Sequence, residues 1–195
     1  MAFFKRERPS PRSQIPPHLE ARFAYINGLQ HAEPPPPWHR TGIVPVGGLW
    51  HVGFGSNSDL ALVISVSGRG VIDCTTGQKL ARDDEEYHPN EGSLDADGIG
   101  PLQDQKIRIA GIWGGGLTRL TADGWSVEPH PLSWPNEELL LCPPGQTMLW
   151  QPNDQEPNLI KLGNFASSLV AYGFSPTGRS LIIATSSEFI IYGRE

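Results

Sequence analysis

The chain has 195 residues, a formal net charge of −6 and 38% apolar residues. This length suits one domain whose core is large enough to need no disulfides or metals. A protein that binds nucleic acid nonspecifically needs a basic surface, so the acidic balance argues against direct nucleic-acid binding. Glycine and proline number 22 and 19. Their spread between short apolar runs favours an all-β fold with many tight turns.

Targeting and redox signals indicate a cytoplasmic protein that binds no membrane. The sequence has no run of about 20 apolar residues that could span a bilayer, and its N-terminus lacks the apolar stretch of a secretory signal. Cys74 and Cys142 each adjoin an apolar run and are expected to pack as small apolar side chains. Neither the cysteines nor the six scattered histidines show metal-ligand spacing, so we expect no metal and no cofactor.

Residues 1–41 are predicted to form a proline-rich N-terminal arm that precedes a β domain over 42–195. Within the arm, apolar residues recur at the i, i+4, i+7 spacing of one short helix over 19–31. The four consecutive prolines at 34–37 predict a stiff polyproline II segment. We expect that segment to pack Trp38 against the domain.

The β domain is predicted to consist of antiparallel meanders. Short apolar and β-branched runs separated by turn residues predict strands over 43–46, 49–54, 60–66, 70–74, 106–113, 117–121, 125–128, 139–142, 147–150, 159–162, 169–174, 180–184 and 189–192. The turn at Asp123-Gly124 is a strong hairpin signal because this pair accepts positive φ. Connections this short favour pairing between consecutive strands.

Two stretches of the chain resemble each other. Residues 50–72 and 170–192 both place a Gly-Phe pair before a polar turn and a following apolar strand. The glycines of these pairs, Gly53 and Gly173, lie 120 residues apart, which would equal three periods of about 40 residues.

One of these stretches carries a resemblance to a known family. Phe-Ser-Pro-Thr-Gly-Arg at 174–179, followed by Leu-Ile-Ile-Ala-Thr at 181–185, resembles the inner strands of a WD-repeat β-propeller blade. Residues 49–82 are similar to a weaker copy, in which 76–80 resembles the turn that closes a blade. The resemblance spans 49–82 and 169–193 and implies a rigid interaction platform. The sequence has no Gly-His or Trp-Asp pair, so a propeller-like and a sandwich-like single domain both stay open.

Residues 83–104 are predicted to form a long acidic loop, which contains no lysine or arginine. Loops of this length inside a domain are usually functional or disordered. The acidic residues that we assign to a docking surface are Asp83, Asp84, Glu85, Glu86, Asp95 and Asp97. We add Trp134 from a proline-bounded loop, because tryptophan is enriched at binding hot spots. The alternative is a solvated loop that only keeps the protein soluble. The spacing of its acidic residues matches no Ca²⁺-binding loop.

No nucleophile, phosphate-binding or metal motif accompanies these features, so the sequence predicts no catalytic residues. The favoured hypothesis is an intracellular protein-binding module whose partner has a basic surface. A concrete version is an immunity or inhibitor protein that masks a toxin or enzyme partner through an acidic, tryptophan-bearing surface. Two alternatives stay open: a small hydrolase or lyase that uses carboxylates and a histidine of 83–97, and a structural subunit of a larger assembly.

Overall fold

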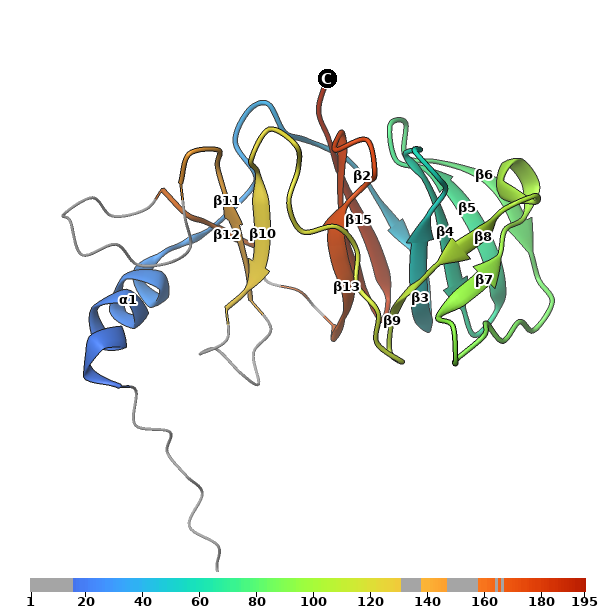
Figure 1. Cartoon of the computed structure of the whole chain (residues 1–195), viewed down its shortest axis with the longest axis horizontal. Coiled ribbons are helices and arrows are strands. Elements are labelled where there is room, and N and C mark those ends of the chain that lie inside the picture. Colours follow the sequence, from blue (N-terminus) through green and yellow to red (C-terminus); the bar gives the residue numbers. More distant parts are fainter. Residues whose placement is uncertain (1–15, 131–137, 147–157, 164, 166) are drawn as a thin grey trace, which may run out of the picture.

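The computed structural model describes residues 16–130, 138–146, 158–163, 165 and 167–195 (Figure 1). The strands form three principal sheets and one small hairpin. Paired strands are antiparallel except β1 and β12, which run parallel. The predicted all-β, antiparallel single domain is therefore confirmed.

Sheet C has the strand order β6-β5-β4-β3-β9. Its strands are β3 (Leu49–Phe54), β4 (Leu60–Ser65), β5 (Gly68–Asp73), β6 (Gln78–Asp83) and β9 (Ala110–Gly111). The first three form the predicted meander. The sequence did not predict β6, because lysine, arginine and aspartate interrupt its apolar residues.

Sheet B has the order β13-β14-β15-β2. Its strands are β13 (Leu169–Phe174), β14 (Ser180–Thr185), β15 (Glu188–Gly193) and β2 (His39–Pro45). The last three strands of the chain therefore form one sheet with a strand from its N-terminal part. This pairing ties segments that are distant in sequence into one cooperative unit.

Sheet A has the order β1-β12-β11-β10. Its strands are β1 (His31–Ala32), β10 (Ser126–Pro129), β11 (Leu139–Cys142) and β12 (Ile160–Leu162). The strand predicted over 147–150 lies outside the described residues.

The sheets stack face to face in the order A, B, C (Figure 1). Helix α1 (Pro17–Gly28) covers the outer face of sheet A, and the hairpin of β7 (Asp95–Asp97) and β8 (Lys106–Arg108) covers that of sheet C. Both end sheets thus bury their second face. In the part of the chain that the structure describes, the row does not close into a propeller ring.

Central strands carry apolar residues on both faces because both faces are buried. On β14, Ile182 contacts the core shared with sheet C, whereas Leu181 and Ile183 contact the core shared with sheet A. On β11, Leu141 faces sheet B and Leu140 faces α1. Complete burial of each such side chain stabilises the fold by about 1.5–3 kcal/mol. The continuous apolar runs in the sequence reflect this double burial.

The N-terminal segment is built onto sheets A and B. Helix α1 confirms the predicted short helix, and its one buried residue, Ile26, packs against sheet A. Trp38 is buried, as predicted, with its ring centroid 5.9 Å from that of Trp125 and 5.5 Å from that of Phe174. The main-chain N–H of Trp38 donates to the Pro35 carbonyl at 3.0 Å, so the chain turns at the end of the proline run instead of continuing as a straight polyproline helix.

The repeat seen in the sequence is also a repeat in strand register. Gly53 pairs with Leu62 in sheet C, and Gly173 pairs with Ile182 in sheet B. A register shift occurs between residues 49 and 51 in sheet C, and another between 169 and 171 in sheet B. A second shift follows between 71 and 72 and between 191 and 192. Paired positions of β3, β4 and β5 in sheet C thus match positions 120 residues later in sheet B, and β6 takes the place that β2 has in sheet B.

Residues 106–128 join the three sheets along one edge. β9 pairs with β3 of sheet C, Thr118 bridges Phe174 of sheet B, and Leu120 bridges Ser126 of sheet A. The predicted strand over 117–121 therefore makes isolated bridges to two sheets. It links sheets A and B at the edge opposite β2.

The segment predicted as a loop over 83–104 is partly regular. It contains the end of β6, all of β7 and the 3₁₀ helix η1 (Gly100–Leu102). Buried Ala96 and Leu102 pack against sheet C and hold this segment there. No helix among the described residues is long and apolar enough to cross a membrane.

Candidate functional site

Arg69 on β5 fixes the acidic segment against sheet C. Its guanidinium forms an ion pair with Asp83, with Nε 3.1 Å from Oδ2. Its Nη1 donates to the Asp97 carbonyl at 3.0 Å, and its Cζ lies 3.9 Å from the ring centroid of Tyr87. A hydrogen bond from the Glu85 N–H, followed by those from Arg69, holds the pKa of Asp83 below its usual value. Asp83 therefore anchors the segment to the protein's own arginine.

Two further acidic residues have basic partners nearby. Asp84 Oδ1 accepts a hydrogen bond from Arg82 Nε at 2.6 Å. Asp97 Oδ1 lies 2.6 Å from Lys106 Nζ, and this contact lowers the pKa of Asp97. These pairs offset much of the negative charge that the sequence assigns to this segment.

The exposed carboxylates of the segment lie between these anchors. Glu85 and Glu86 are both exposed, and Asp95 is half-buried on β7. Glu86 Oε1 lies 3.1 Å from His88 Nε2, with side chains 80% and 61% exposed. Water screens an ion pair of this kind strongly. Among the described residues, Glu85 and Glu86 are thus the exposed predicted docking residues that have no lysine or arginine partner.

His88 brings the acidic segment to an aromatic group on sheet C. Its ring centroid lies 6.2 Å from that of Trp50. The Trp50 carbonyl accepts a hydrogen bond from the Ile112 N–H at 3.1 Å, and Ile112 is 55% exposed. Trp113 follows in the chain and, like Trp50, is half-buried. We call this surface the acidic–aromatic face; it consists of Trp50, Glu85, Glu86, His88, Ile112 and Trp113.

His51 lies beneath the acidic–aromatic face. It is fully buried, and its ring centroid is 4.6 Å from that of Trp113. Neither ring nitrogen has a hydrogen-bond partner among the described residues. Burial without a partner disfavours the charged form, so the pKa of His51 is lowered. The neutral ring of His51 packs against the ring of Trp113.

Sequence reasoning found only part of this face. Trp134, the predicted exposed tryptophan, lies outside the described residues. The chain has six tryptophans, and no sequence pattern singles out Trp50 or Trp113 among them. Pairing of β9 with β3 places Trp113 near Trp50, and no local pattern encodes this pairing. The only sequence signal was the high tryptophan content.

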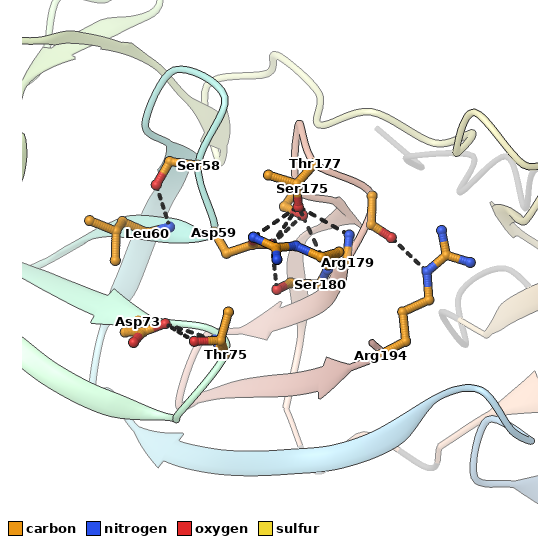
Figure 2. Close-up of polar contacts among 11 residues, drawn as sticks. Ser58, Asp59, Leu60, Asp73, Thr75, Ser175, Thr177, Arg179, Ser180 and Arg194 are labelled. Atoms are coloured by element: carbon orange, nitrogen blue, oxygen red, sulfur yellow. Dashed lines mark hydrogen bonds and ion pairs between the residues drawn. The ribbon is translucent and has the colours of Figure 1, made fainter.

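A second polar cluster joins sheets B and C, and Asp59 is at its centre (Figure 2). Its carboxylate, in the turn before β4, is buried and accepts hydrogen bonds from the turn between β13 and β14. The donors are Ser175 Oγ at 2.7 Å, Ser180 Oγ at 2.7 Å, Thr177 Oγ1 at 2.8 Å and Arg179 Nη2 at 3.0 Å. Both carboxylate oxygens of Asp59 are thus hydrogen-bonded by residues of sheet B and of its β13–β14 turn.

The chemistry of this cluster indicates a structural clamp. Burial alone would raise the pKa of Asp59, but the hydrogen bonds outweigh burial and lower it. A carboxylate with a lowered pKa is a weak base and is poorly suited to activate Ser175 as a nucleophile. Beside the clamp, Arg194 Nε donates to the Gly178 carbonyl at 2.8 Å and stabilises the same turn (Figure 2).

Within the described ranges, no group of three histidine, cysteine or carboxylate side chains is placed to hold a metal ion. Neither comparison by sequence identifies relatives: no protein-family model matches the chain, and no curated protein is similar to it. The candidate site therefore rests on geometry alone.

Proposed function

We propose that this protein is a protein-binding module that docks on a basic surface of another protein through the acidic–aromatic face. The observation that carries the proposal is the contact between Trp50 and His88. It places the exposed Glu86–His88 pair against an aromatic side chain of sheet C. Exposed Ile112 lies next to Trp50 through a main-chain hydrogen bond. Binding hot spots combine apolar anchors of this kind with a polar rim.

The partner chemistry follows from the exposed carboxylates that have no lysine or arginine partner among the described residues. Glu85 and Glu86 are exposed beside the aromatic group, so a partner with lysine or arginine would complement them. An immunity or inhibitor protein that covers the active site of a toxin or enzyme is a concrete case of this proposal. Shared strand register in sheets B and C supports the view that both are blade-like units, and kinship with WD repeats stays a prediction.

Geometry favours docking over the hydrolase or lyase alternative. The one pairing of a carboxylate with a histidine within 83–97 is that of Glu86 with His88, and both side chains face water. Groups that perform acid–base catalysis are usually tuned by partial burial and by fixed neighbours. A structural-subunit role would instead appear as a stable homo-oligomer in light scattering.

Two variants test the acidic–aromatic face, each with a matched control. The protein is used to capture partners from its native lysate, and the purified partner is then titrated against each variant at low and moderate salt. Ile112→Ser should weaken binding about tenfold or more. Leu120→Ser removes another exposed leucine-sized side chain and should leave affinity unchanged.

The charge variant is Glu85→Gln with Glu86→Gln. It should slow association and flatten its salt dependence, because rim charges act mainly on the association rate. Glu20→Gln with Glu195→Gln changes the net charge equally at two other exposed positions. Equal association rates for the two double variants would refute the acidic–aromatic face as the docking surface.

A further inference from the structure

A cavity of about 190 Å³ lies between sheets B and C, away from the residues of the acidic–aromatic face. Pro45 to Gly47, at the end of β2, form one wall. Val63 and Ile72 of sheet C form an apolar floor. The volume is below the usual range for drug-sized ligands and suits a compound of a few heavy atoms.

The cavity exists because two cross-strand positions of sheet C are glycine. Gly70 pairs with Val63, and Gly68 pairs with Ser65, and all four line the cavity. In sheet B, the positions that lie 120 residues later carry Ile190 and Glu188. Sheet C therefore leaves a cavity at the two positions where sheet B carries side chains.

A β-bulge places two cations at the mouth of this cavity. Gly70 pairs with Arg82 and Ile72 pairs with Lys79, so Leu80 is the extra residue on β6. Without the bulge, residues three apart on a strand would face opposite sides. With it, Lys79 and Arg82 both line the cavity, which is a recognised use of bulges near binding sites.

The two cations are held differently. Arg82 Nη2 donates to the Ser67 carbonyl at 2.7 Å, and its Nε bonds to Asp84. Arg82 is therefore fixed across the mouth with one charge partner. Lys79 is exposed and has no ion-pair partner in the described part of the chain. The mouth thus has a net positive charge on a protein that is acidic overall.

We propose that this cavity binds a small free monocarboxylate with a short branched apolar tail. The tail would lie on Val63 and Ile72, and the carboxylate would contact Lys79 and Arg82. A buried aliphatic group contributes through the water-exposed area that it loses, and a charge-assisted hydrogen bond adds both affinity and orientation. The amphipathic lining excludes a bare inorganic anion as the best ligand.

The test is titration of the full-length protein with 4-methylpentanoate, followed by amide chemical shifts in NMR. The expected result is saturable shifts at Val63, Gly70 and Lys79. The matched amide, 4-methylpentanamide, should bind about tenfold more weakly because it lacks the charge. Inorganic phosphate should bind more weakly than the carboxylate because it lacks the tail. Phosphate binding as tight as that of the acid would overturn the assignment, as would the absence of saturable binding by the acid.

Two variants assign any binding to this cavity. Gly70→Val should abolish it by filling the space; a Cβ at Gly70 meets only the Ala81 carbonyl at 3.6 Å, an ordinary contact. Lys79→Met removes charge without adding bulk and should weaken binding about tenfold. Arg40→Met changes the cation at the matching position of β2 and should leave binding unchanged. Loss in Arg40→Met but not in Lys79→Met would place the ligand elsewhere and refute the proposal.

Discussion

Sheets B and C have the same strand register and the same two bulges, yet they differ in the residues that could bind a partner or ligand. Where sheet C has Trp50 and His51, sheet B has Val170 and Ala171. At these positions sheet B has only apolar aliphatic residues. The comparison teaches that the shared framework is structural and that candidate binding features arise where sheet C departs from it.

Matching positions of the two sheets also meet each other. Asp59 and Arg179 are 120 residues apart, and their side chains form an ion pair between the sheets with Nη2 3.0 Å from Oδ2. Only Asp59 is buried, whereas the Arg179 side chain is 58% exposed. The copy of the repeat in sheet C therefore supplies a buried acceptor, and the copy in sheet B supplies its donors.

The largest expected effect comes from removing that acceptor. Asp59→Ala leaves Ser175, Thr177 and Ser180 without their shared partner inside the protein. Loss of one member of a buried, hydrogen-bonded charge cluster costs about 3–5 kcal/mol. Urea denaturation measures the change in the free energy of unfolding.

The control for Asp59 is Asp84, whose side chain is 81% exposed in its pair with Arg82. Asp84→Ala should cost less than about 1 kcal/mol. If the two substitutions cost the same, Asp59 does not clamp the sheets.

A smaller effect is expected at the glycines shared by the two sheets. A Cβ at Gly53 would lie 2.4 Å from the Arg108 carbonyl, and one at Gly173 would lie 2.7 Å from the Thr118 carbonyl. Gly53→Ala and Gly173→Ala should each destabilise the protein by about 1–3 kcal/mol, because the edge segment must move away. Thermal or urea unfolding would detect this loss.

Gly47 supplies the matched control for these glycines. Nothing lies within 4 Å of a Cβ built there, so Gly47→Ala should change stability by less than about 0.5 kcal/mol. Equal losses at Gly47 and Gly53 would show that the close approach of the edge segment is not the cause.

The smallest expected effect is on the pH dependence of the unfolding free energy. It comes from His51, whose counterpart in sheet B is Ala171, which does not titrate. Because burial lowers the pKa of His51, the folded state disfavours its protonation. Stability is therefore full above the unfolded-state pKa of about 6.5 and falls as the pH drops below it. His51→Ala should make unfolding free energy less dependent on pH between about 7.5 and 5.

Asp59 provides the contrasting pH window. Its pKa is lowered in the folded state, so its contribution is full above about pH 4 and is lost as the pH falls further. His51→Ala should leave the loss of stability below about pH 4 unchanged. An unchanged slope above pH 5 in His51→Ala would contradict the burial argument.

Much of the strand pattern could be predicted because local composition decides it. The bounds of β3, β11 and β13 coincide with the predicted ranges of residues 49–54, 139–142 and 169–174. Apolar runs bounded by turn residues suffice for such strands. β6 lacks such a run, and its place in sheet C depends on pairing with β5.

The candidate site could be predicted only in part. The acidic residues were visible in the sequence, but their partners Arg69 and Lys106 come from β5 and β8. Three of the predicted acidic residues therefore pair with lysine or arginine, whereas Glu85 and Glu86 have no such partner among the described residues. The aromatic neighbours were missed because strand pairing between β3 and β9 brings them together.

The sequence by itself determined the all-β class, the short helix, most strand positions and the 120-residue repeat. These features follow from periodicity and turn chemistry, which act over a few neighbouring residues. Only the tertiary structure decided the stacking of three sheets, the Asp59 clamp, the acidic–aromatic face and the cavity. Each of these depends on contacts between residues far apart in the chain, and on bulges that change which side chains share a face.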